Sequence, residues 1–258
     1  MIPQPAINAW SRDFSWPTLD QVEQDLLLAR LIVEIANDDY LGGELVFRGG
    51  TCLHKMHLER PLRYSEDLDY VRATSGGIGQ LTRAVTELGK RLDMKVSTRV
   101  GLYPKMFFKA PFESGTGTMR IKVEVNTFER LPARPLARKT FTVTSSWFAG
   151  SAQVQTFSPE ELMATKLRAL YQRSKGRDLF DLWLALTEMG LDPGGIFESF
   201  GPYRPERYTQ ALAEANLRAK VADPDFRNDL TPLVAVWPEN YNIDAAAELV
   251  IENLFRLL

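Results

Sequence analysis

Apolar residues recur at helical spacing near the start of the chain and give way to short alternating segments further on. In LDQVEQDLLLARLIVEIAN, residues 19–37, apolar positions such as Val22, Leu26 and Val33 predict an amphipathic or buried helix. Two glycines at 42 and 43 end this pattern. The next segment, ELVFRGG, indicates a short strand that runs into Gly-Gly, and TCLHKMHLE indicates a short helix after it.

A second alternating segment follows Pro61. In LRYSEDLDYVR, Leu68 and Tyr70 alternate with Asp67 and Asp69, which is the period of two of a strand with one polar face. Both aspartates should therefore point the same way. A helix is predicted at 81–93, and strands are predicted at 94–101, 105–112, 120–128 and 138–147, which together indicate a mixed sheet.

The last part of the chain has the pattern of a helical domain. SPEE at 158–161 combines a Ser N-cap, a Pro at the first helical position and Glu161 three residues after the cap, so it predicts a capping box and a helix start. Further helices are predicted from DLFDLWLALTEMG to the terminal IDAAAELVIENLFRLL. We expect an α/β fold with a catalytic domain over 1–150 and a mostly helical domain over 151–258.

Composition narrows the class of protein. With 258 residues, 45% hydrophobic and 25% charged, the chain matches a globular protein with a substantial core, and fibrous and disordered classes are excluded. The single cysteine, Cys52, cannot form an intramolecular disulfide, and the first residues lack the features of a signal peptide. No apolar run approaches the ~20 residues of a membrane span. We expect a cytoplasmic protein.

The net charge of -2 hides an uneven distribution. Residues 83–139 hold 13 Lys and Arg against 5 Asp and Glu, whereas the segments on either side are acidic. A basic segment is the electrostatic footprint of a phosphate-rich ligand such as RNA. A solvated basic surface explains the same charges.

The pattern that carries chemistry is Gly49-Gly50-Thr51 at a strand-to-helix junction, followed by Asp67-Leu68-Asp69. Glycines let a backbone approach a ligand closely, and the free N–H groups at a helix start suit a triphosphate. Two carboxylates on one strand face can share Mg²⁺ with substrate phosphates. Each feature alone suits a tight turn or a solvated strand. Together they indicate metal-assisted nucleotidyl transfer.

At these residues the sequence resembles the polymerase-β-like nucleotidyltransferases, whose pattern is a hydrophobic residue, Gly-Gly or Gly-Ser, a spacer and Asp-hydrophobic-Asp. More narrowly, FRGGTCLHKMHLERPLRYSEDLDYV and SPEELMATKLRALYQRSKGRDLFDLW resemble the two blocks of the AbiEii family, which includes the MenT toxins of bacterial toxin–antitoxin systems. The resemblance covers residues 20–190. It implies a polymerase-β-like core and a nucleotidyltransferase toxin.

Carried over by position, the resemblance implies that Gly49, Gly50 and Thr51 form the nucleotide-phosphate loop and that Asp67 and Asp69 hold Mg²⁺ or Mn²⁺. Ser65 takes the place of the serine in the family's Ser-x-Asp motif, which is a regulatory phosphorylation site in some members. Capping of the loop before the strand explains Ser65 as well.

Glu124 is our candidate for a third metal ligand, because it lies on the polar face of the strand RIKVEVN. Lys122 shares that face, and an ion pair between Lys122 and Glu124 is the structural alternative.

On the capped helix, Lys166 and Arg173 can face one ligand and suit phosphate oxygens, although solvated helix cations are the alternative. The family resemblance implies that Lys166 stabilises charge on the triphosphate. Asp178 and Asp181 lie on one face of the next helix and can orient Lys166 or Arg173. Asp178 also suits the start of a helix, where the dipole favours an acid. The resemblance favours Asp178, and it implies that the helical domain contributes its Lys and Asp to the active-site cleft.

These features predict a Mg²⁺-dependent enzyme that transfers a nucleotide from an NTP to an acceptor hydroxyl. Resemblance to the MenT branch implies that the acceptor is RNA, at the 3′ end of tRNA, that the transfer blocks translation, and that a cognate antitoxin exists. The alternatives are transfer to a protein or small-molecule hydroxyl, and a non-catalytic nucleotide-binding module.

Overall fold

The computed structural model describes residues 1–258, which divide into two compact units. The first unit comprises residues 1–131 and 136–157, and the second comprises residues 132–135 and 158–258. The boundary expected between residues 150 and 151 falls inside a strand, Ala149–Thr156, so the first unit continues to Phe157. The short segment 132–135 belongs to the helical unit although the sequence on both sides of it belongs to the first.

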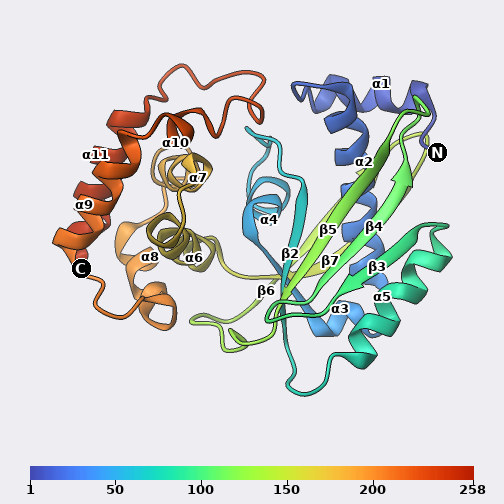
Figure 1. The fold of residues 1–258 in the computed structure, drawn as a ribbon, viewed down its shortest axis with the longest axis horizontal. Coiled ribbons are helices and arrows are strands. Elements are labelled where there is room, and N and C mark those ends of the chain that lie inside the picture. Colours follow the sequence, from blue (N-terminus) through green and yellow to red (C-terminus); the bar gives the residue numbers. More distant parts are fainter. The chain divides into compact units, whose positions relative to one another are not determined.

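A seven-stranded mixed sheet forms the first unit (Figure 1). Its strand order is β3-β4-β5-β2-β1-β7-β6. The pairs β1–β7 and β2–β5 are parallel and the others are antiparallel. The α/β fold with a mixed sheet is therefore confirmed. The strands are β1 (Leu45–Arg48), β2 (Asp67–Arg72), β3 (Lys95–Arg99), β4 (Lys105–Pro111), β5 (Thr118–Asn126), β6 (Ala137–Thr144) and β7 (Ala149–Thr156).

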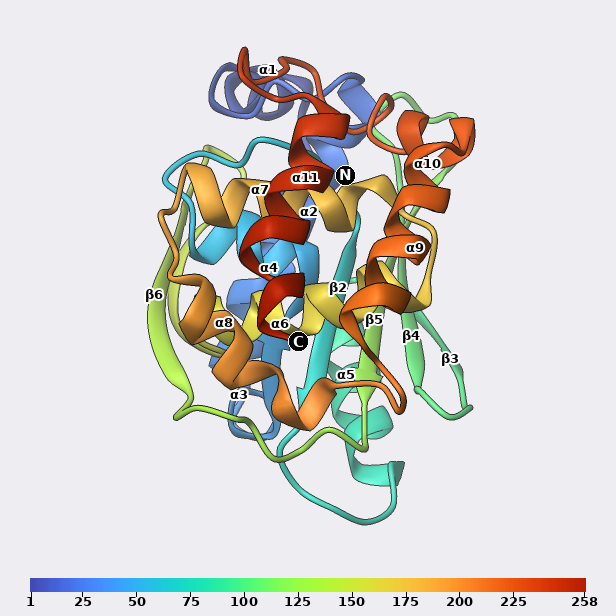
Figure 2. The same cartoon turned by 90° about the vertical axis from the view of Figure 1, so that its left-hand side faces the viewer.

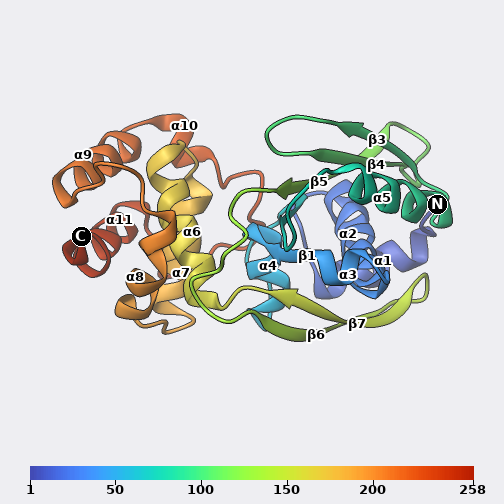
Figure 3. The same ribbon diagram turned by 90° about the horizontal axis from the view of Figure 1, so that it is seen from below.

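Five helices belong to this unit: α1 (Gln4–Asp13), α2 (Leu19–Asn37), α3 (Leu41–Glu44), α4 (Gly49–Met56) and α5 (Gly79–Arg91). Thr18 and Gln21 form a reciprocal capping box that fixes the start of α2. Helix α2 packs against β6 and β7, α5 against β3 and β4, and α4 against β1 and β2. In Figure 3, α2 lies within the curve of the sheet, between β4–β5 and β6–β7.

Alternation along β5 shows how the sheet separates its two faces. Met119, Ile121, Val123 and Val125 are buried, whereas the residues between them reach solvent at least in part. Met106 and Phe108 of β4 are buried on the same face as Val123 and Ile121. Gly89 of α5 lies close enough to Val96 of β3 that an added Cβ would be 2.2 Å from its Cγ2. The helices thus cover the apolar face, and the opposite face carries the charged residues of the site.

The second unit is helical, with α6 (Pro159–Gln172), α7 (Gly176–Thr187), α8 (Pro193–Phe200), α9 (Gln210–Val221), α10 (Pro224–Asn228), α11 (Ile243–Asn253) and two 3₁₀ turns, Gly201–Tyr203 and Phe255–Leu257. Figure 2 shows α11 and α9 beside the pair formed by α6 and α7. No helix in the structure is long and apolar enough to cross a membrane.

The start of α6 differs in one respect from the predicted capping box. Ser158 accepts a hydrogen bond from the Glu161 backbone N–H as expected. The Glu161 carboxylate does not return to the cap. It accepts hydrogen bonds from the backbone N–H groups of Ala133 and Arg134, at 2.6 and 3.0 Å, and from the Tyr203 hydroxyl at 2.5 Å. This buried carboxylate therefore ties the segment 132–135 to the helical unit.

Candidate active site

The Gly-Gly turn joins β1 to α4, and a particular side chain lies against each glycine. Gly49 has a φ of 82°, and a Cβ there would lie 2.5 Å from Oδ2 of Asp69. At Gly50, a Cβ would lie 2.4 Å from Nη2 of Arg63. The absence of side chains thus lets the Asp69 carboxylate and the Arg63 guanidinium approach the first turn of α4.

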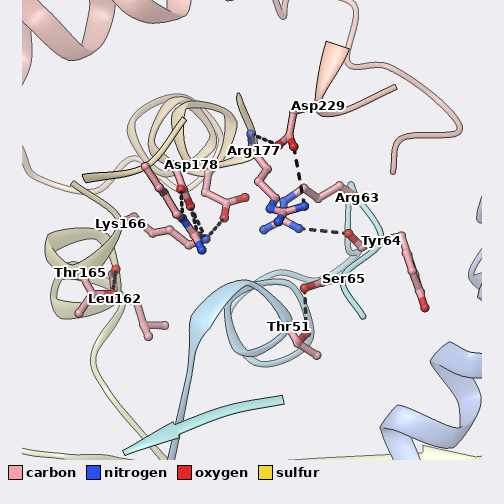
Figure 4. Close-up of polar contacts among 12 residues, drawn as sticks. Thr51, Arg63, Tyr64, Ser65, Leu162, Thr165, Lys166, Arg177, Asp178 and Asp229 are labelled. Carbon is pink, nitrogen blue, oxygen red and sulfur yellow. Dashed lines mark hydrogen bonds and ion pairs between the residues drawn. The ribbon is translucent and has the colours of Figure 1, made fainter. Parts of the chain in front are cut away.

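Arg63 is a site residue that the sequence did not distinguish from its neighbour Arg60. It is buried, and its Nη1 donates a hydrogen bond to the Tyr64 carbonyl at 3.1 Å (Figure 4). The first backbone N–H groups of α4 and this guanidinium are both donors suited to anions. Only the structure reveals their proximity, because it depends on the path of the loop between α4 and β2.

Thr51 and Ser65 join the start of α4 to the start of β2. The Thr51 hydroxyl lies 2.9 Å from Oγ of Ser65 (Figure 4). It donates a hydrogen bond to the Asp67 carbonyl oxygen at 2.5 Å. Thr51 is buried, so its hydroxyl is engaged within the protein rather than directed outward. Ser65 lies beside the Gly-Gly turn, with Oγ 3.2 Å from the position of a Cβ at Gly50. The two hydroxyls hold the turn and the carboxylates in one framework.

The carboxylates lie on the exposed face of β2, as the alternation predicted. Leu68 and Tyr70 are buried, whereas Asp67 and Asp69 are partly exposed. Asp69 is directly opposite Arg48 on β1 and Glu124 on β5. Residues directly opposite in neighbouring strands share a face, so the structure brings Asp67, Asp69 and Glu124 to one surface.

Lys122 lies among these carboxylates. Its Nζ is 2.9 Å from Oδ2 of Asp67 and 3.0 Å from Oε2 of Glu124. Lys105 also contacts Glu124, at 3.3 Å. The ion pair that the sequence offered as an alternative role for Glu124 is therefore present. Its role as a third metal ligand stays a prediction.

The charges at this surface are unevenly balanced. Burial and the neighbouring Asp67 carboxylate raise the pKa of Asp69, and burial raises the pKa of Asp67 despite the contact with Lys122. Burial alone would also raise the pKa of Glu124, but Lys122 and Lys105 outweigh it and hold that pKa below its usual value. Negative charge is thus under-compensated at Asp67 and Asp69.

This donor set fits a hard divalent cation at the Asp67–Asp69 pair. Mg²⁺ binds carboxylate oxygens and takes its remaining ligands from water and substrate phosphates, so two protein carboxylates suffice. No group of three His, Cys, Asp or Glu side chains in the structure is arranged to hold a metal. Asp67 and Asp69 are the residues that would hold the ion, and Lys122 supplies a positive charge beside them.

In the helical unit, Lys166 contacts both aspartates of α7. Its Nζ is 3.0 Å from Oδ1 of Asp178 and 2.8 Å from Oδ2 of Asp181 (Figure 4 shows Lys166 and Asp178). Both aspartates are fully buried. The two aspartates therefore lie on one face of α7, as their i, i+3 spacing predicted. Together they fix the ammonium of Lys166 in position.

Arg173 completes this cluster from the end of α6. Its Nε and Nη2 donate to the two carboxylate oxygens of Asp178, at 2.7 and 2.8 Å, although half of the arginine side chain is exposed. Burial alone would raise the pKa of Asp178, but Lys166 and Arg173 outweigh it and hold the pKa below its usual value. The cluster of Lys166, Arg173, Asp178 and Asp181 is therefore balanced in charge.

Cys52 has none of the features of a nucleophile. Its thiol is buried, with Sγ 2.9 Å from Oγ1 of Thr156, and burial raises its pKa to about 12. A thiol with such a pKa stays protonated and unreactive. The chemistry at this surface is consequently that of carboxylates and cations.

A strand that leads into Gly-Gly at a helix start and a carboxylate pair on the adjacent strand define a nucleotidyltransferase core. The sequence comparison identifies the particular family: residues 30–245 match the family described as nucleotidyl transferase AbiEii toxin, type IV TA system. The chain belongs to this family of toxin nucleotidyltransferases. The expected enzyme class is confirmed.

Solved structures show the same fold. MenT4, a nucleotidyltransferase toxin from Mycobacterium tuberculosis H37Rv, is 18% identical with a TM-score of 0.52, over 95% of this chain and 98% of that chain. JHP933 from Helicobacter pylori is 17% identical with a TM-score of 0.51, over 93% and 95% of the two chains. The comparison with curated proteins gives no match.

Proposed function

We propose that this toxin transfers the nucleoside monophosphate of an NTP to a hydroxyl of an RNA acceptor, at the 3′ end of tRNA, and so blocks translation. The observation that carries the proposal is the juxtaposition of the Gly49-Gly50 turn with the Asp67–Asp69 pair. The basic strands beside these carboxylates support an RNA acceptor. A cognate antitoxin is the partner that a toxin of this family implies.

In this proposal the chain's own residues bind and orient the triphosphate. The N–H groups at the start of α4 and the Arg63 guanidinium bind phosphate oxygens. Gly49 keeps the backbone close to Asp69, and Thr51 and Ser65 hold α4 against β2. The acceptor hydroxyl attacks the α-phosphorus and pyrophosphate leaves. Mg²⁺ or Mn²⁺ held by Asp67 and Asp69 would stabilise the charge that develops on the attacking and leaving oxygens.

Lys166, Asp178 and Arg173 are proposed as contributors to the same reaction. The ammonium of Lys166, fixed by two buried aspartates, suits the stabilisation of phosphate charge. Asp178 acts as a positioning residue for Lys166 and Arg173.

The test is incubation of the purified protein with bulk bacterial RNA, Mg²⁺ and each labelled NTP in turn, with products resolved on a denaturing gel. Wild type should label the tRNA band with a preferred NTP. Asp67→Ala should lower the rate by about 10³-fold, since metal stabilisation supplies several kcal/mol. Asp13→Ala, at an exposed aspartate of α1, is the matched control and should keep the wild-type rate.

Nucleotidyl transfer at the wild-type rate by a folded Asp67→Ala protein would contradict the proposal. Label on a protein instead of RNA would redirect it to a protein acceptor, and NTP binding without any transfer would indicate a nucleotide-binding module.

A further inference from the structure

The polar face of the sheet continues from the carboxylates onto β5, β4 and β3, where it becomes basic. Arg120 on β5 is directly opposite Lys109 on β4, and Lys109 is directly opposite Lys95 on β3. Three cations thus form one row across three strands. Like charges directly opposite each other destabilise a sheet, so this row opposes folding and favours an anionic ligand.

None of these cations has a carboxylate partner in the structure, and all three are exposed. Arg99 at the end of β3 is exposed and unpaired as well. The contrast with Lys105 and Lys122 is clear, because those two lysines pair with Glu124. Figure 3 shows α5 and α2 on the opposite side of β3 and β4, so no helix of this unit covers the basic face.

The basic face is continuous with the proposed catalytic carboxylates. Arg99 is directly opposite Lys105, Lys105 is directly opposite Glu124, and Glu124 is directly opposite Asp69. With strands about 4.8 Å apart, this row leads from Asp69 to Arg99 in about 15 Å. That distance corresponds to a few nucleotides of a single-stranded chain.

Aromatic rings accompany these charges. The Arg120 guanidinium lies 3.8 Å from the centroid of Phe107, which lies on the same face. Beyond the ends of β4 and β5, Tyr103 and Phe128 form an edge-to-face pair with centroids 6.0 Å apart. Phe128 is 59% exposed, and Asn126 fixes its turn by accepting the backbone N–H groups of Phe128 and Glu129. An exposed ring held in place is a surface for base stacking.

From these observations we infer that one face of the sheet binds the phosphates of the RNA acceptor, and that this face is formed by Lys95, Arg99, Lys109 and Arg120. Tyr103 and Phe128 then stack on an unpaired base near the end of that RNA. The inference rests on the proposed function and assigns its acceptor surface. Regularly spaced cations beside exposed rings suit a single-stranded nucleic acid. An acidic protein would match the charges but not the rings.

The experiment measures binding of fluorescein-labelled bulk tRNA by anisotropy over a range of salt concentrations, without NTP, so that turnover plays no part. Lys95→Gln/Arg99→Gln/Lys109→Gln removes three exposed charges from the face. Arg12→Gln/Arg83→Gln/Lys90→Gln removes three exposed charges from α1 and α5 and is the matched control. Phe128→Ala tests the stacking surface. Binding of a fluorescent NTP is measured for every variant.

We expect the first triple variant to weaken tRNA binding at least tenfold near physiological salt and to lower the slope of log Kd against log salt by about 2. Phe128→Ala should weaken binding without changing the slope. Neither variant should alter NTP binding. The control should bind tRNA as wild type does.

Equal tRNA affinity of the two triple variants would overturn the inference, while transfer to RNA by wild type would still stand as a separate result. Poly-L-glutamate serves as a second probe that stands for an acidic protein. If the Lys95→Gln/Arg99→Gln/Lys109→Gln variant bound poly-L-glutamate more weakly but tRNA as wild type does, the inference would be overturned and the face would be assigned to an acidic protein. Absence of transfer by a wild type that binds tRNA through this face would instead contradict the proposed function.

Discussion

At the scale of single residues, the fold opposes the ionisation of Asp67 and Asp69. Burial raises the pKa of both carboxyl groups, and the neighbouring Asp67 carboxylate raises that of Asp69 further. For an acid whose pKa is raised in the folded state, ionisation opposes folding, so stability is lost as the pH rises through the folded value. A bound divalent cation would reverse this penalty.

Asp69→Asn should therefore raise the melting temperature at neutral pH in metal-free buffer by about 2–4 °C, the shift that about 1 kcal/mol produces in a chain of this size. Mg²⁺ should raise the melting temperature of wild type and leave that of the variant unchanged, since a ligand stabilises only the state that binds it. Thermal melts with EDTA and with Mg²⁺ measure both effects. A less stable variant, or an equal Mg²⁺ shift in both proteins, would contradict the assignment of Asp69.

The same reasoning separates structure from function at Lys166. Lys166→Met leaves two buried carboxylates without their shared partner, which costs about 3–5 kcal/mol. We expect a melting temperature lower by about 10 °C or more. Asp181→Asn added to Lys166→Met restores the charge balance and should recover part of the stability.

Nucleotidyl transfer by the folded double variant then decides the role of Lys166. If Lys166 takes part in the reaction, transfer stays at least about a hundredfold below wild type, in the range measured for a lost electrostatic donor. Recovery of transfer together with stability would show that Lys166 is only structural.

At the scale of elements, the β1–α4 turn gives the sharpest prediction. Gly49→Ala places a Cβ at 2.5 Å from the Asp69 carboxylate and a side chain at a φ of 82°. We expect a loss of about 1 kcal/mol or more in the free energy of unfolding, and a loss of transfer. Gly43→Ala on α3 is the control, because its Cβ meets nothing within 4 Å. Denaturant melts and transfer rates of both variants measure the effect, and equal behaviour would refute the close approach.

Elements with strong periodic patterns were predictable from the sequence. The α2 pattern, the Asp67–Leu68–Asp69 alternation and the Ser158 cap all correspond to observed elements. Strand β7 was missed because its buried positions, Ala152, Val154 and Thr156, are small or polar and give a weak apolar signal. Helix α1 was missed too, since only three of its residues are buried.

Contacts between distant segments were not predictable. The reciprocal capping box expected at Glu161 fails because Ala133, Arg134 and Tyr203 offer its carboxylate better partners from other segments. Arg63 gave no signal, because its contact with Gly50 depends on the loop that returns to β2. Lys105 reaches Glu124 only through the register of β4 against β5.

At the scale of the whole molecule, the net charge of -2 is a poor guide to the ligand. The sequence showed a basic middle segment, but its significance depends on the sheet order β3-β4-β5-β2, which places unpaired cations beside the carboxylates. The family was recognisable from its two sequence blocks, and the match over residues 30–245 confirms it. The acceptor and the metal stay predictions.

The central claim is nucleotidyl transfer, and the position of the label in the NTP tests it most directly. Two parallel reactions contain tRNA, Mg²⁺ and the preferred NTP, labelled with ³²P at the α-phosphate in one and at the γ-phosphate in the other. The label is then measured in the RNA and in the released pyrophosphate. We predict label in tRNA from the α-labelled NTP only, and label in pyrophosphate from the γ-labelled NTP. Label in tRNA from the γ-labelled NTP, or none from the α-labelled NTP, would contradict the account.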